Sequence, residues 1–415
     1  MKTIYDSIIL FPLVLNLFDG NTNVTTDTGL SDEMKTYYSD YLIDMAEPEL
    51  VHDQFGQKHP IPKNGGKTIE FRKYDPLPKA LTPLTEGVTP DGRKLTMGVI
   101  TSTVHQYGDY IELSDILLLT AIDNNLVQAT RLLGSQAGRT LDTITREVLS
   151  GGTNVQFAEG QVESRSALTG GDETEENNHY LTVNAIRLAV RFLKVMNAPR
   201  INGYYVGIIH PDCSYDLMND PKWVNVKTYS DPEGIYEGEI GRIEGVRFVE
   251  TTEAKIFAGE DLASDSRTLT VNGSSVTSAT TVPFDGGTVE AGALVGRKVN
   301  IGGTVTEVTA NTANSLTVKD EVTAADNTVI YPGEGGKNGR AVYSTLVLGA
   351  DAYGVTEITG GGLQHIVKQL GSAGTADPLN QRATAGWKAT KTAERLVEAY
   401  MIRIETASTF DSLPN

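Results

Sequence analysis

The segment from Gly65 to Asp115 constrains the fold more than any other part of the chain. Two strand-like runs, Thr68–Tyr74 and Lys94–Tyr110, flank a long connection that contains four prolines, Pro76, Pro78, Pro83 and Pro90. Proline disfavours helix and removes a backbone donor, so we expect the connection to be extended and irregular. Loops of this length are uncommon inside a compact domain. The segment is therefore predicted to reach beyond its own subunit and to be held by a neighbour.

Size and charge exclude several classes of protein. A chain of 415 residues can bury two or three linked cores. Its single cysteine, Cys213, excludes an internal disulfide framework and a cysteine-rich zinc site. A net charge of −18 argues against a surface that grips nucleic acid, which needs clustered Lys and Arg. An acidic wall could enclose nucleic acid without adhering to it, although on charge alone simple solubility is the favoured explanation.

The N-terminal region is predicted to be an arm. Its apolar run Ile8–Phe18 is interrupted by Pro12 and Asn16 and is not followed by a small-residue cleavage site. These features favour an apolar segment that packs on a partner over a signal peptide, and the run is too short to span a bilayer. Spacing of aromatic and apolar residues predicts a helix from Ser31 to about Val51.

The central region alternates helices and strands. Apolar residues at three- and four-residue steps predict a helix from Asn125 to Leu149, ended by Gly151 and Gly152. Thr182 can cap a second helix that extends to Met196. Further along we predict a buried strand at Tyr204–Ile209, a turn at Pro211, a strand at Val246–Glu250, and a closing strand around Tyr400–Ile404.

Residues 260–335 differ from the rest of the chain. They are rich in Thr, Val, Ser, Gly and Asn, and short β-branched runs alternate with turn residues. This pattern predicts a small β-sandwich or barrel. Because the buried run Val342–Gly349 follows, we expect the β unit to be inserted into a host domain.

No motif predicts an active site. Gly66-Lys67-Thr68 lacks the upstream glycine and following helix of a phosphate-binding loop. His210 and Cys213 could form a thiol–imidazole pair, but no orienting residue is identifiable and a structural turn is favoured. The six histidines lack metal-ligand spacing. We therefore predict no catalytic, cofactor or metal site, and a protein that is not an enzyme.

Five stretches, taken in order, resemble the major capsid proteins of tailed phages with the Hong Kong 97-type fold, and within them the family typified by coliphage N-four. The stretches are QFGQKHPIPKNGGKTIEFRKYDPL (54–77), LTEGVTPDGRKL (84–95), VHQYGDYIELSD (104–115), GEIGRIEGVRFVET (238–251) and GWKATKTAERLVEAYMIRIETAS (386–408). They are spread over most of the chain outside 260–335.

The resemblance implies an α+β fold in seven parts. These are an N-terminal arm (1–60), an extended E-loop hairpin (61–112), a P-domain with a long spine helix (113–200), a first A-domain part (201–259), the inserted β domain (260–335), a second A-domain part (336–370) and a closing P-domain segment (371–415). It also implies self-assembly into hexamers and pentamers of an icosahedral shell that encloses double-stranded DNA without sequence-specific binding. Portal, scaffolding and decoration proteins are the expected partners, with no membrane. The location is the virion, after assembly in the host bacterial cytoplasm.

We predict that charged side chains of the loop pair with neighbouring subunits and that two tyrosines anchor its base. The charged residues are Lys67, Arg72, Lys73, Glu86, Arg93 and Lys94, and the tyrosines are Tyr107 and Tyr110.

Two other functions fit parts of the sequence. The Thr/Val-rich β unit and apolar N-terminus are also typical of a secreted adhesin or carbohydrate-binding protein. An encapsulin-like compartment shell would share the fold and enclose enzymes in place of DNA.

Overall fold

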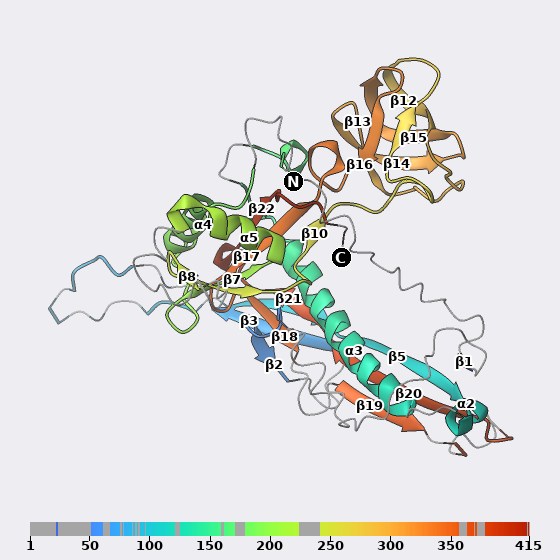
Figure 1. Cartoon of the computed structure of the whole chain (residues 1–415). Coiled ribbons are helices and arrows are strands. Elements are labelled where there is room, and N and C mark those ends of the chain that lie inside the picture. Colours follow the sequence, from blue (N-terminus) through green and yellow to red (C-terminus); the bar gives the residue numbers. More distant parts are fainter. Residues whose placement is uncertain are drawn as a thin grey trace. The chain divides into compact units, whose positions relative to one another are not determined.

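A computed structural model describes residues 22–23, 51–60, 67–74, 77, 79–84, 86–87, 89, 92–95, 97–120, 125–158, 162–170, 179–223, 241–356, 363–368, 370–371, 378–412 and 414 (Figure 1). The chain divides into two compact units. The first combines residues 1–50, 104–141 and 357–391, and the second combines 51–103, 142–356 and 392–415. The predicted helix from Ser31 to Val51 and the apolar run Ile8–Phe18 lie almost wholly outside the described residues.

The first unit is built on a four-stranded sheet. Its strands, in spatial order, are β1 (Thr22–Asn23), β5 (His105–Ser114), β20 (Arg382–Lys391) and β19 (Leu363–Lys368). Strands β5 and β20 pair antiparallel over their full length, from Arg382 opposite Ser114 to Lys391 opposite His105. The short helix α2 (Asp115–Thr120) follows β5 directly.

The long helix α3 (Asn125–Ser150) confirms the predicted spine helix to within one residue. Its buried stripe includes Leu133, Ala137 and Leu141, as the three- and four-residue spacing predicts. In the first unit the indole N–H of Trp387 on β20 donates to the side-chain oxygen of Gln136 at 3.2 Å, and the amide of Gln136 donates to Asp109 on β5 at 2.7 Å. These bonds link the helix to the two central strands of the sheet.

The second unit contains a seven-stranded mixed sheet. Six strands follow the order β6 (Val155–Phe157), β22 (Met401–Thr406), β17 (Val342–Leu348), β7 (Tyr205–Ile209), β9 (Val246–Glu250) and β8 (Arg242–Ile243), and β10 (Ile256–Phe257) also pairs with β17. Strands β7, β17 and β22 are buried along their whole length. Burial of successive residues means that both faces of the sheet are covered, which explains the continuous apolar runs in the sequence.

One face of this sheet carries helix α4 (Val183–Val195). The side chain of Thr182 accepts a hydrogen bond from the backbone N–H of Ala185 at 3.2 Å and caps the helix as predicted. Ile186, Val190 and Leu193 are buried in a core cluster shared with β7 and β17. The predicted helix and its cap are therefore confirmed.

The turn predicted at Pro211 is wrong. The chain forms helix α5 (Pro211–Asn219) directly after β7. Proline stands at the first helical position, where its missing N–H costs nothing, and His210 acts as the N-cap by accepting from the N–H of Asp212 at 3.2 Å. A proline after a strand is compatible with the predicted turn and with the first position of a helix, and here it starts a helix.

Buried polar groups surround the C-terminal half of α3. His52 lies fully buried with its Nδ1 2.6 Å from Oδ2 of Asp142, and Thr145 donates to Asp53 at 2.6 Å. The last carbonyls of the helix are satisfied by arginines: Arg395 donates to the Val148 carbonyl at 2.6 Å, and Arg403 donates to Ser150. The chain just after residue 50 is thus fixed to the spine helix by hydrogen bonds in the protein interior.

Residues 269–332 form a closed six-stranded barrel. Its strands, in order around the barrel, are β11 (Leu269–Val271), β12 (Val276–Asp285), β15 (Ser315–Ala324), β14 (Thr304–Asn311), β13 (Lys298–Ile301) and β16 (Val329–Pro332). Alternate residues point inward and fill the core, among them Val282, Phe284 and Leu316. In sequence the barrel lies between β10 and β17, which pair with each other.

Candidate assembly surface

The predicted loop is a two-stranded hairpin whose tip is described in part. Strands β3 (Thr68–Tyr74) and β4 (Met97–Thr103) pair antiparallel from Thr68 opposite Thr103 to Tyr74 opposite Met97. The strand predicted at Thr68–Tyr74 is confirmed. The second run, Lys94–Tyr110, is corrected to two strands, because the chain changes partner at Val104: β4 pairs with β3, whereas β5 pairs with β20.

Phe71 fixes the base of the hairpin. Its side chain is 1% exposed, and its ring meets the ring of His59 edge-on at a centroid distance of 4.8 Å. The ring also lies against Gly354 in β18 (Tyr353–Thr356), so close that a Cβ on that glycine would be 2.4 Å from a ring carbon. Strand β18 in turn pairs with β2 (Gln57–His59) and β21 (Ala393–Arg395). The hairpin base is therefore packed into the second unit.

The hairpin beyond this base is apolar and exposed. Four leucines of the connection are between 55% and 82% exposed, and two residues of β4 are each 45% exposed; they are Leu77, Leu81, Leu84, Leu95, Met97 and Val99. These leucines were not among the predicted contact residues, although their occurrence in a proline-rich connection was an available signal. We call this set the hairpin leucine surface. Such a concentration of exposed apolar side chains is typical of a contact surface for another protein.

The predicted charges of the loop lie on the same hairpin. Lys67, Arg72, Glu86, Arg93 and Lys94 are all exposed. Within the part of the chain that the structure describes, no hydrogen bond or ion pair engages any of these five side chains. Lys73 lies in β3, and its side chain is outside the description.

The two predicted anchor tyrosines lie on β5, in the first unit. Tyr107 is half-buried opposite Ala389, and Tyr110 is 57% exposed opposite Gly386. A Cβ on Gly386 would lie 2.8 Å from the Cβ of Tyr110, so the backbone of β20 approaches closely at this position. The structure therefore groups the tyrosines with the sheet of the first unit and the charges with the hairpin of the second.

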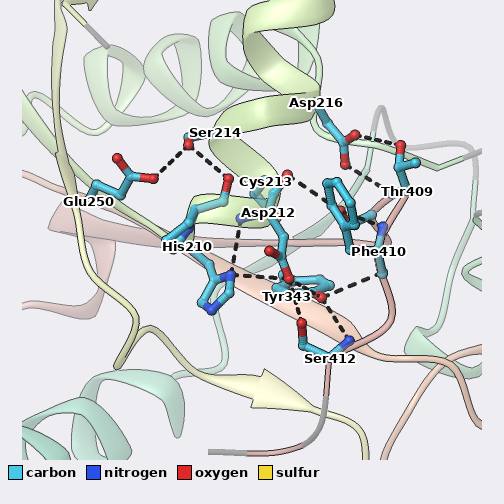
Figure 2. Close-up of polar contacts among 12 residues, drawn as sticks. His210, Asp212, Cys213, Ser214, Asp216, Glu250, Tyr343, Thr409, Phe410 and Ser412 are labelled. Atoms are coloured by element: carbon cyan, nitrogen blue, oxygen red, sulfur yellow. Dashed lines mark hydrogen bonds and ion pairs between the residues drawn. The ribbon is translucent and has the colours of Figure 1, made fainter. Parts of the chain in front are cut away.

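A second polar cluster surrounds the start of α5 (Figure 2). The Asp212 carboxylate accepts hydrogen bonds from the Tyr343 hydroxyl at 2.6 Å and the Ser412 hydroxyl at 2.7 Å. One turn later, Asp216 accepts from the hydroxyl of Thr409 at 2.6 Å. Residues after β22 are thereby held along the helix, so this cluster has a structural explanation.

The cluster does not form the thiol–imidazole pair considered from the sequence. Cys213 is fully buried, its sulfur lies 3.7 Å from the hydroxyl of Thr406, and burial raises the pKa of its thiol far above the ordinary value. His210 is occupied as the helix cap, and burial lowers its pKa. A buried neutral thiol cannot serve as a nucleophile.

The described residues contain no group of three or more His, Cys, Asp or Glu side chains that could hold a metal ion. Among them, no helix is long and apolar enough to cross a bilayer.

Comparison with known proteins gives a consistent result. The profile of a family described as phage capsid protein matches residues 119–355, which is more than half of the chain. The chain belongs to the phage capsid protein family. It is a structural subunit of a capsid shell, and neither the adhesin nor the enzyme-filled compartment considered from the sequence is favoured.

Solved capsids share the fold at low sequence identity. The capsid of cyanophage Pam1 matches with 11% identity and a TM-score of 0.52, over 93% of this chain and 98% of that one. The capsids of cyanophage P-SCSP1u and Ralstonia phage GP4 each match with 12% identity and a TM-score of 0.51, covering 93% and 94% of this chain and 93% and 97% of theirs, respectively. No curated protein sequence matches the chain.

Proposed function

We propose that this capsid protein has the Hong Kong 97-type fold, is related to the coliphage N-four-type capsid proteins, and assembles through the β3–β4 hairpin into hexamers and pentamers of an icosahedral shell. The observation that carries the proposal is the hairpin leucine surface: a firmly packed base supports a tip that exposes leucines and charges without partners in the described chain. Such a tip gains stability only when another subunit covers it.

The magnitudes favour assembly through many modest contacts. Burying one leucine side chain contributes about 1.5–3 kcal/mol before the entropy of association is subtracted. A few leucines therefore give a moderate contact between two subunits. Repetition of that contact around closed rings stabilises the whole shell, because each subunit is held by several neighbours at once.

The charges of the hairpin are proposed to direct this contact. Lys67, Arg72, Lys73, Arg93 and Lys94 would meet carboxylates of a neighbouring subunit, and Glu86 would meet a cation there. Charge pairs at the rim of an interface contribute more to orientation and to selection of the partner than to affinity. Tyr107 and Tyr110 are proposed to support the contact from β5.

We further propose a correspondence between the chain and the parts of this capsid fold. Residues 1–60 form the arm, 61–112 the E-loop, 113–200 and 371–415 the P-domain, and 201–259 and 336–370 the A-domain. Residues 260–335, which include the barrel, form an inserted domain. The support is the order of elements, with an extended hairpin, a long helix, a mixed sheet and an interrupting barrel in sequence.

The remaining roles follow from this assignment. The shell encloses double-stranded DNA without sequence-specific contacts, and the net charge of −18 supports a wall to which DNA does not adhere. Portal, scaffolding and decoration proteins are the proposed partners, and assembly takes place in the host bacterial cytoplasm. The protein acts as a structural component and not as an enzyme, and it uses no cofactor.

Electron microscopy with sedimentation velocity tests the proposal. The chain is co-expressed with its neighbouring phage genes, once as the wild type and once as the double variant Arg72→Glu/Arg93→Glu. The wild type should give closed shells or free rings, whereas the variant should remain folded and fail to close. A matched control reverses two exposed barrel charges, Lys298→Glu/Lys319→Glu, and should assemble normally. Normal shells from the hairpin variant would refute a role for these charges.

A further inference from the structure

Helix α4 has an outer face with an unusual composition. Its inner face is buried, whereas Arg187, Arg191 and Lys194 are exposed at steps of four and three residues. The helix contains no Asp or Glu, although the whole chain has a net charge of −18. Because the protein as a whole is acidic, the basic face of one copy has a charge opposite to that of most of the surface of another copy.

The cations on this face are only partly neutralised. Arg187 donates to Oε1 of Glu244 through Nη2 at 2.7 Å and through Nε at 3.1 Å. Arg191 and Lys194 make no ion pair or hydrogen bond through their side chains with any residue that the structure describes. An open hollow of about 390 Å³ lies on this face. It is lined by Arg187, Val190, Arg191, Lys194, Val195 and Glu244.

Apolar side chains accompany the cations. Val195 is 60% exposed, Met196 is 42% exposed and Leu188 is 37% exposed. A nucleic acid backbone would be recognised by cations and hydrogen-bond donors alone, and would leave these side chains in water. Arg and Met next to exposed aliphatic residues are instead enriched in contacts between proteins. The composition therefore favours a protein surface that carries both carboxylates and apolar groups.

We infer that the outer face of α4 docks against an acidic surface of a second copy of this chain in the assembled shell, with Arg191 and Lys194 pairing with its carboxylates and Val195 buried at the centre. The inference rests on the proposed function, because a shell brings copies of the chain together. The proposed α4 contact is separate from the hairpin contact, because α4 packs on the seven-stranded sheet and the hairpin strands are not part of that sheet.

Thiol labelling provides a direct test. The chain has one cysteine, Cys213, which is fully buried, so a cysteine introduced at an exposed site dominates the reaction with a maleimide. Val195→Cys reports on the α4 face. Val295→Cys is the matched control, because Val295 is a valine of similar exposure, 51%, on the barrel.

The expected result is specific to the shell. Val195→Cys should react readily in free subunits and at least about tenfold more slowly in empty shells, because the reaction then requires the contact to open. Val295→Cys should change much less. Arg191→Glu/Lys194→Glu should raise the subunit concentration needed for assembly by about tenfold, equivalent to 1.4 kcal/mol, whereas the barrel variant Lys298→Glu/Lys319→Glu should not.

Three outcomes would overturn the inference, and they are distinguishable. Equal labelling of Val195→Cys in subunits and shells, with wild-type shells present, would mean that the face is free. Protection only in DNA-filled particles would assign the face to DNA. Absence of any assembly by the wild type with its partner genes would refute the proposed function and this inference with it.

Discussion

The contact between Phe71 and Gly354 gives a quantitative prediction about the base of the hairpin. A Cβ added at Gly354 would lie 2.4 Å and 2.7 Å from two carbons of the Phe71 ring, whereas ordinary contact begins at 3.4 Å. Gly354 lies inside a strand and is not in the left-handed region, so its backbone accepts alanine. The steric effect of the ring can therefore be separated from the effect of the backbone.

The sign of the effect should depend on the ring. Without a clash, replacing a strand glycine by alanine stabilises by roughly 0.5–1 kcal/mol, because glycine loses more entropy on folding. With the buried ring in place, overpacking costs about 1–3 kcal/mol, so Gly354→Ala should lower the free energy of unfolding. Phe71→Ala alone should cost about 3–5 kcal/mol through the cavity that it leaves. In that background Gly354→Ala should become neutral or stabilising.

Guanidinium denaturation of free subunits, followed by circular dichroism, measures all four members of this double-mutant cycle. We expect the two substitutions to be strongly non-additive, with the double variant more stable than the sum of the single effects. Additive free energies of unfolding, or destabilisation by Gly354→Ala in both backgrounds, would show that Phe71 does not pack on this glycine and that the hairpin base is held differently.

Three further predictions concern the second unit. Burial lowers the pKa of His210 below 6.5, against the opposing effects of the Asp212 and Glu250 carboxylates. The folded state therefore binds a proton at His210 less readily than the unfolded state does. The stabilising contribution of neutral His210 is present above pH 6.5 and is lost as the pH falls. His210→Asn keeps a cap but does not titrate, so its free energy of unfolding should decline less between pH 7 and pH 5. Arg403→Leu should cost about 3–5 kcal/mol, because it removes a buried cation 2.7 Å from Glu405 and bonded to two carbonyls. Arg187→Leu, at an exposed position, should lower the free energy of unfolding by less than about 1 kcal/mol. Equal losses of stability for the two variants in thermal melts would contradict the buried network around Arg403. Finally, Cys213 should react with a thiol reagent only at the rate of unfolding, and rapid reaction of the native chain would contradict its burial.

Strong periodic signals in the sequence were sufficient for several elements. The α3 and α4 helices, the Thr182 cap and strands β3 and β9 were predicted to within a residue or two, because each follows from neighbours in sequence. The error at Pro211 has a local cause. Proline is compatible with a turn and with the first turn of a helix, and only the His210 cap decides between them.

Long-range contacts could not be predicted in this way. The pair of His52 with Asp142 joins residues 90 positions apart, and the contact of Arg165 with Glu405 at 2.7 Å joins residues 240 positions apart. A polar residue on a helical stripe gives no indication of its partner. The division of Lys94–Tyr110 between two sheets was hidden for the same reason, because the strand pattern is continuous while the partners differ.

The candidate surface shows what the sequence pattern could and could not indicate. Prolines and loop length indicated the hairpin, and its described charges are exposed, while their pairing with neighbouring subunits stays a prediction. The leucines of the hairpin were not predicted to be exposed, because leucine is among the residues most often buried in proteins. The exposed fractions of Leu81 and Leu84, 82% and 77%, follow only from the three-dimensional structure.

Cryo-electron microscopy of shells assembled from this chain would locate the hairpin relative to neighbouring subunits, and so tests whether the hairpin joins them. We predict that Leu81 and Leu84 are covered by an adjacent copy, with carboxylates near Arg72 and Arg93. A shell in which the hairpin lies exposed to solvent, with its leucines uncovered and subunits joined only through other surfaces, would contradict it.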